Sequence, residues 1–113
     1  MEDASLNWNE YQAFVVSTKK YSEGYRLIYP ILGLASEAGE VAGKMKKILR
    51  DHDGQIDQET AERLFDELGD VLWYVTCCVD DMGQTLENLA WHNAEKLASR
   101  MERGVIQGDG DTR

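Results

Sequence analysis

The chain has 113 residues, enough for one domain with a modest core. Its 12 basic and 21 acidic residues give a net charge of −9. This balance argues against general binding to nucleic acid or to an anionic membrane, which requires a basic surface. The longest apolar run, 71–79, is too short to span a bilayer, and the acidic N-terminus is unlike a signal peptide. Cys77 and Cys78 are adjacent and cannot form an ordinary disulfide, so we expect reduced thiols and a cytoplasmic protein.

Helical spacing of apolar residues, without sustained β-type alternation, predicts an all-α chain. Asn7 and Glu10 resemble a capping box, Pro30 suits a first helical turn, and Asp57 and Thr85 are candidate caps. Gly83 is expected to end the third helix. We therefore predict one domain over 1–113 with a four-helix bundle-like arrangement and a flexible tail at 104–113. The predicted helices are 8–21, 31–50, 58–82 and 86–102.

Two acidic pairs dominate the middle of the chain. Glu37 and Glu40 precede the turn-like run 51–54, and Glu67 and Asp70 follow it at a similar distance. In an antiparallel hairpin Glu37 then lies level with Asp70, and Glu40 with Glu67, so four carboxylates meet at one height. Such a cluster repels itself unless cations fill it, and its oxygen ligands suit Mg²⁺, with Mn²⁺ as a substitute. Solvated faces of two acidic helices remain the alternative.

Other polar residues recur on the predicted helices. A glycine inside each acidic pair, Gly39 and Gly69, suggests that the helices approach closely there. Lys44 and Lys47 share a stripe with the first pair, either as ordinary ion pairs or as phosphate-binding cations. On spacing alone, the polar face of the last helix and Gln12 on the first are equally well explained as solvated surface. The last helix contributes Asn93, Lys96 and Arg100.

Two motifs resemble those of the MazG-like nucleotide pyrophosphohydrolases of the all-α NTP pyrophosphohydrolase superfamily. They are Gly-Leu-Ala-Ser-Glu-Ala-Gly-Glu-Val at 33–41 and Asp-Glu-Leu-Gly-Asp-Val-Leu-Trp-Tyr at 66–74. The resemblance continues through 10–12, Lys44-x-x-Lys47, 93–100 and the ending 108–113. One position departs from the pattern, because Ser36 stands where many members carry a third acid before the first motif glutamate.

The resemblance implies hydrolysis of (deoxy)nucleoside triphosphates to monophosphates with release of pyrophosphate, in nucleotide-pool control or house-cleaning. Mg²⁺ would be held by the four catalytic acids, with Glu37 positioning the attacking water. The tail would order over the site, with Arg113 reaching a phosphate or an acid. Phosphates would be bound by Lys44, Lys47, Lys96 and Arg100, and base or sugar by Trp8, Gln12 and Asn93.

The family is also typically dimeric or tetrameric, with sites that use neighbouring subunits. Trp8, Trp73 and Trp91, together with a wide apolar face on the third predicted helix, exceed what a monomer of this size needs, so we expect a homodimer or homotetramer. A virus-encoded member would act in the host cytoplasm.

Three other kinds of protein also carry clustered acids or helical bundles. A di-iron bundle needs Glu-x-x-His pairs, and neither His52 nor His92 has a glutamate three residues before it. A non-catalytic helical interaction module would need no mirrored acids. A dUTP/dCTP- or phosphoribosyl-ATP-type hydrolase of the same superfamily stays open, although the tail and the run 33–40 favour the MazG-like branch.

Overall fold

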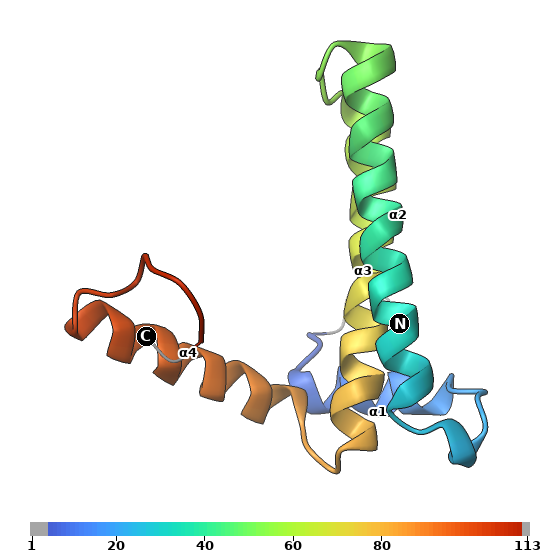
Figure 1. Ribbon diagram of the computed structural model, residues 1–113. Helices are drawn as coiled ribbons and strands as arrows, with labels where there is room; N and C mark the ends of the chain where they lie inside the picture. The colour runs from blue at the N-terminus through green and yellow to red at the C-terminus, as the bar shows by residue number, and fades with distance from the viewer. Residues whose placement is uncertain (1–4, 112–113) are drawn as a thin grey trace.

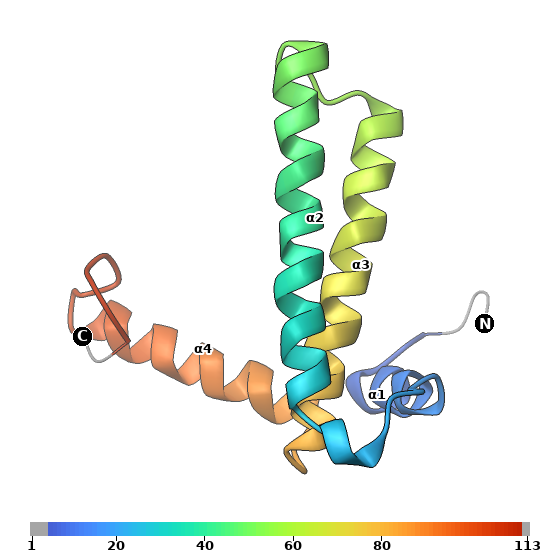
Figure 2. The ribbon, with the colours of Figure 1, turned by 45° about the vertical axis from the view of Figure 1, so that its right-hand side comes forward.

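The computed structural model describes residues 5–111, all helix, turn and loop, with no strand in that range. The all-α prediction is confirmed. Helices α2 and α3 form a long antiparallel hairpin, α1 crosses its base, and α4 runs away from it (Figures 1 and 2). The elements are α1 (Trp8–Ser17), the 3₁₀ turn η1 (Glu23–Tyr25), α2 (Ile28–His52), α3 (Gln58–Asp81) and α4 (Leu86–Glu102).

The helix starts follow the predicted capping residues. The side chain of Asn7 accepts from the Glu10 N–H at 2.8 Å, and Asp57 accepts from the Thr60 N–H at 2.8 Å. Thr85 does the same for α4. Each contact satisfies a backbone donor that the first turn of a helix leaves without an intrahelical partner. The capping residues therefore predicted the first residue of α1, α3 and α4 correctly.

The connection between α1 and α2 departs from the prediction. Helix α1 ends at Ser17 rather than at 21, and α2 begins at Ile28 rather than at 31. The cause lies in Asp81 at the end of α3, whose carboxylate accepts hydrogen bonds from Lys19 Nζ at 2.7 Å, Tyr21 Oη at 2.8 Å and the Leu27 N–H at 2.8 Å. Only 1% of the Asp81 side chain is exposed. We call these four residues the Asp81 anchor.

Gln12 joins α1 to the turn between α3 and α4. Its amide nitrogen donates to the Gln84 carbonyl at 2.9 Å, and its amide oxygen accepts from the Leu86 N–H at 2.8 Å. The small core of the molecule lies around this junction, at the base of the hairpin. It includes Val15, Cys77, Val79 and Leu86.

The arrangement is more open than the bundle we expected. The radius of gyration is 17.0 Å, against about 13 Å for a compact domain of this length. Helix α4 contacts α1 and α3 but does not pack along the hairpin, because it leaves a turn that Gln12 holds at the base (Figure 2). Large apolar side chains are consequently exposed on the hairpin and on α4. They include Ile31, Leu32, Phe65, Leu68, Leu89, Trp91, Leu97 and Met101.

A tyrosine of α3 packs directly against α2 at Gly33. A Cβ added there would lie 2.1 Å from Cε1 of Tyr74, so the tyrosine ring occupies the space that a side chain would need. Our expectation of close approach at Gly39 and Gly69 is wrong within the described chain, since an added Cβ at either meets nothing within 4 Å. The Gly33–Tyr74 contact therefore sets the spacing of α2 against α3.

We predict that Gly33→Ala destabilises the protein by about 1–3 kcal/mol, because the methyl group overpacks against the Tyr74 ring. Gly43→Ala is the matched control: it lies in the same helix, and an added Cβ meets nothing within 4 Å there. That variant should be neutral or stabilising by up to about 1 kcal/mol through helix propensity. Urea denaturation of both variants tests this, and equal stabilities would contradict the role given to Gly33.

Candidate active site

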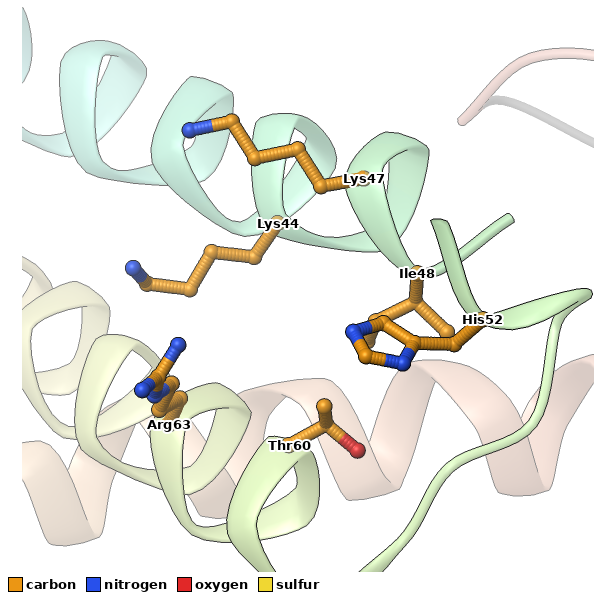
Figure 3. Close-up of a pocket in the computed structure, with 6 residues that line it drawn as sticks. All are labelled: Lys44, Lys47, Ile48, His52, Thr60 and Arg63. Carbon is orange, nitrogen blue, oxygen red and sulfur yellow. The ribbon is translucent and has the colours of Figure 1, made fainter. Parts of the chain in front are cut away.

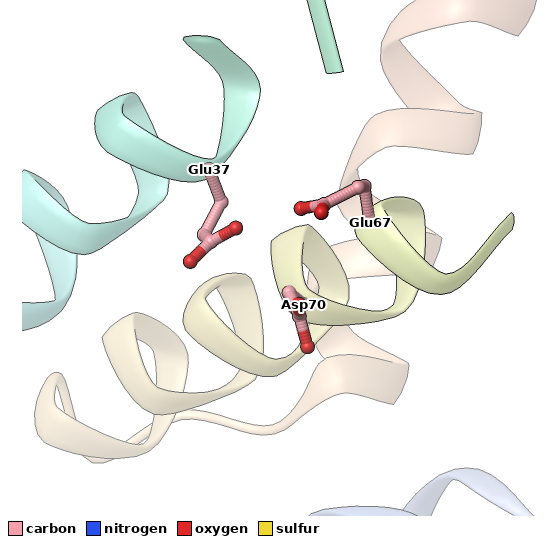
Figure 4. Close-up of side chains that lie close together, drawn as sticks. All are labelled: Glu37, Glu67 and Asp70. Atoms are coloured by element: carbon pink, nitrogen blue, oxygen red, sulfur yellow. The ribbon is translucent and has the colours of Figure 1, made fainter. Parts of the chain in front are cut away.

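Three carboxylates meet midway along the hairpin. Glu37 projects from α2 toward α3, which carries Glu67 and Asp70 (Figure 4). One carboxylate oxygen from each lies within 4.8 Å of the other two. We call these residues the acid trio. The equal spacing of the acidic pairs from the turn predicted this meeting, and the hairpin brings it about.

Glu40, the fourth predicted acid, lies one turn further along α2, is exposed, and is not in the trio. Its charge still acts on Glu37, whose pKa is raised above its ordinary value. The causes are burial first, then a hydrogen bond with Glu67 and the charges of Asp70, Glu67 and Glu40. Lys44 offsets part of this repulsion, with Nζ 3.5 Å from a Glu67 oxygen. A divalent cation with a preference for oxygen ligands fits the residual negative charge.

A basic pocket of about 120 Å³ adjoins the trio on the side of the hairpin tip (Figure 3). Lys44 connects the two, because it lines the pocket and pairs with Glu67 of the trio. Arg63, His52 and Thr60 were missed by the sequence analysis. The available signal was that Arg63 lies seven residues before Asp70, on the same stripe of α3. The residues of the basic pocket are Lys44, Lys47, Ile48, His52, Thr60 and Arg63.

The other end of the hairpin carries aromatic rings. Tyr21 and Tyr29 stack with ring centroids 4.9 Å apart, and Trp73 donates its indole N–H to Thr18 Oγ1 at 2.8 Å. Burial, and then the neighbouring Tyr29 and the Glu37 charge, raise the pKa of the Tyr74 hydroxyl. We call this hollow the aromatic pocket; it is lined by Thr18, Lys20, Tyr21, Tyr29, Trp73 and Tyr74.

The predicted residues of α4 are not beside the acid trio in the same chain, because α4 diverges from the hairpin (Figure 1). The tail folds back on α4 instead. Arg100 Nη2 donates to the Asp111 carbonyl at 2.9 Å, and Lys96 Nζ lies 3.5 Å from Asp111 Oδ1. These two cations hold the pKa of the Asp111 carboxyl below its usual value, with Lys96 as the larger influence. Arg113 lies outside the described residues.

The candidates for base or sugar contacts are dispersed. Trp8 is half exposed, beside a hollow that it shares with Trp91 of α4. Asn93 is exposed on α4. Gln12 is buried, and its amide already holds the α3–α4 turn. The structure thus gives Gln12 a structural role, and a contact of Gln12 with the nucleotide stays a prediction.

Comparison with known proteins agrees with this geometry. The MazG nucleotide pyrophosphohydrolase domain matches residues 30–105, a range that covers the whole acid trio and the basic pocket. The gene 37 protein of Mycobacterium phage L5 is 52% identical to this chain over 87 residues, which is 77% of this chain and 76% of that protein. No solved structure matches the chain.

The fold and the acid trio define an all-α protein of the nucleotide pyrophosphohydrolase class. The chain belongs to the MazG nucleotide pyrophosphohydrolase family, whose members generally use divalent metals. The three carboxylates of the trio fit that use. None of the helices within 5–111 is both long and apolar enough to cross a membrane.

We predict that Glu37→Gln raises the melting temperature of the metal-free protein at neutral pH. The raised pKa of Glu37 means that its charged form is disfavoured in the folded state, so folding loses free energy above that pKa and recovers it as the pH falls toward the unfolded value of about 4.3. The advantage of the variant should therefore shrink on acidification.

The melting temperatures of both proteins are measured in the presence of a chelator, once at neutral pH and once near pH 4.3, about the unfolded pKa of a glutamate. Glu62→Gln is the matched control, since it removes an exposed charge from the same hairpin outside the trio. If both variants shift the melting temperature equally, repulsion within the trio is not the cause.

Proposed function

We propose that this protein hydrolyses (deoxy)nucleoside triphosphates to monophosphates and pyrophosphate, with Mg²⁺ as cofactor and Mn²⁺ as a substitute. The observation that carries the proposal is the acid trio with a basic pocket directly beside it. A triphosphate needs both: cations for its oxygens, and carboxylates that hold a metal and orient water. Family membership supplies the reaction class.

The roles of the residues follow from their positions. Glu37, Glu67 and Asp70 would hold the metal, with Glu40 as an outer acid. When bound, the metal neutralises charge on the phosphate oxygens and makes the α-phosphorus more electrophilic. Glu37, the one acid of the trio that α2 contributes, would also orient the attacking water.

In this reaction the oxygen of water forms a bond to the α-phosphorus, and the bond from that phosphorus to the α–β bridging oxygen breaks. The bridging oxygen leaves with the pyrophosphate. The water yields one proton through Glu37 to the solvent. Lys44, beside Glu67, is placed to balance charge on the phosphates during this step.

We predict that Asp70→Asn and Glu40→Gln each lower kcat at least about a hundredfold, as expected for loss of a group that stabilises transition-state charge, while the fold is retained. The assay follows pyrophosphate and monophosphate release from a panel of NTPs and dNTPs, with circular dichroism as the check on folding. Near-normal turnover in either variant would remove that residue from the essential set. A wild-type protein that releases only orthophosphate would contradict the reaction itself.

We further propose that the protein is a homodimer or larger, with α4 of one copy placed over the hairpin of another. The exposed apolar side chains of both elements support this, as does the large radius of gyration. In such an assembly Asn93, Lys96 and Arg100 serve a neighbouring site. Phosphate could then compete with Asp111 for Lys96 and Arg100.

Mixing two inactive variants tests the shared site. Asp70→Asn removes an acid of the hairpin, and Lys96→Ala removes a cation of α4. If sites are shared, mixed dimers carry one intact site, and a mixture refolded together should regain about a quarter of wild-type activity. A mixture as inactive as its components, or a monomeric and active wild type in sedimentation, would contradict the proposal.

The phage origin of the relative supports a role in nucleotide-pool control or house-cleaning within an infected cell, and hence the host cytoplasm as the location. The net charge of −9 supports a nucleotide rather than a nucleic acid as the ligand.

A further inference from the structure

The groove of the hairpin has two unlike ends. Two turns from the acid trio toward the tip, beyond Glu40, the side chains on the same stripes are cationic: Lys44 lies seven residues after Glu37, and Arg63 seven residues before Asp70. Toward the base, by contrast, the corresponding side chain is aromatic: Tyr74 lies seven residues after Glu67. The groove therefore runs from the basic pocket, past the carboxylates, to the aromatic pocket.

A nucleoside triphosphate has the same order of chemistry. Its terminal phosphates are a multiply charged anion, its scissile α-phosphate lies next, and its base is a flat aromatic ring. Bound with the terminal phosphates in the basic pocket, it meets cations there and rings at the other end. The reverse orientation would leave the phosphates among aromatic rings with a single lysine, Lys20, and the base among Lys44, Lys47 and Arg63.

We propose that the basic pocket is the subsite for the leaving pyrophosphate, and that Arg63, which nothing else assigns to the site, binds it from α3. The inference rests on the proposed function and gives the substrate its direction. Lys44 of α2 and Arg63 of α3 reach into the same space from opposite sides (Figure 3), so together they can hold an anion between the helices. An arginine adds paired N–H donors that match phosphate oxygens.

The contact that Arg63 makes in the free protein does not prevent this role. Its guanidinium pairs with Glu59 at 2.6 Å, one turn away on the same helix, with 64% of the Arg63 side chain exposed. An exposed pair of this kind is weak and is readily exchanged for a more highly charged anion. His52 and Thr60 line the same pocket; the Thr60 hydroxyl donates to the Asp57 carbonyl at 3.1 Å, which leaves the His52 imidazole as the further polar group there.

The test measures the binding of inorganic pyrophosphate by calorimetry at a fixed Mg²⁺ concentration, so that no turnover is needed. We expect Arg63→Ala to weaken pyrophosphate binding about tenfold, as for loss of a charge-assisted contact, and Arg63→Lys to weaken it less. Binding of the nucleoside monophosphate product should stay within about twofold of the wild type, because that product lies at the other end of the groove.

Arg50→Ala is the matched control. Arg50 also has 64% of its side chain exposed and pairs with a neighbouring acid, Asp51, but it does not line the pocket. That variant should bind pyrophosphate as the wild type does. If Arg63→Ala and Arg50→Ala behave alike, or if Arg63→Ala weakens the monophosphate as much as pyrophosphate, the subsite assignment is wrong.

The two proposals fail separately. A protein that hydrolyses triphosphates but binds pyrophosphate independently of Arg63 keeps its function and loses the subsite. A protein whose pyrophosphate binding depends on Arg63, but which hydrolyses no triphosphate, keeps the subsite as an anion site and loses the function.

Discussion

The Asp81 anchor is the constraint on which the placement of the hairpin depends. One buried carboxylate receives the ammonium of Lys19, the hydroxyl of Tyr21 and the backbone N–H of Leu27. These contacts hold the pKa of Asp81 below its usual value against the opposing effect of burial, which is the largest single influence on it. Leu27 adopts a positive φ of 64°, which an isolated leucine avoids. The anchor thus fixes where α2 starts relative to the end of α3.

The acid trio depends on that placement. Leu27 directly precedes α2, which carries Glu37, and Asp70 and Asp81 both belong to α3, so a shift of α2 by one turn would move Glu37 about 5.4 Å along the groove. The Tyr74 ring over Gly33 is the second fixed point, between the anchor and the acids. The anchor and the Gly33–Tyr74 contact hold three like charges together, and this arrangement costs free energy as long as no cation is bound. Active sites commonly carry such locally unfavourable arrangements.

The parts that the sequence predicted are those with local signals. Asn7, Asp57 and Thr85 each cap a helix through a residue three positions away, and three of the four paired acids meet because the pairs lie equally far from one turn. The missed parts depend on distant partners. Gln12 meets Gln84 and Leu86, and Lys19 meets Asp81, so neither role could be read from neighbouring residues. The role of Arg63 could not be predicted from α3 alone, because the pocket that it lines is completed by Lys44 and Lys47 of the facing helix α2. The direction of α4 had no local signal either.

The hairpin also has a consequence for the order in which the molecule folds. Its two helices are consecutive in the chain and are joined by a short turn, so the loop-closure entropy of bringing the acid trio together is small. Contacts of low sequence separation form early, whereas the junction of α1 with the α3–α4 turn must wait for segments about seventy residues apart to meet. The carboxylates can therefore gather in a nascent hairpin before the base of the molecule is complete. The repulsion among these carboxylates would then act already on the nascent hairpin, before the finished site exists.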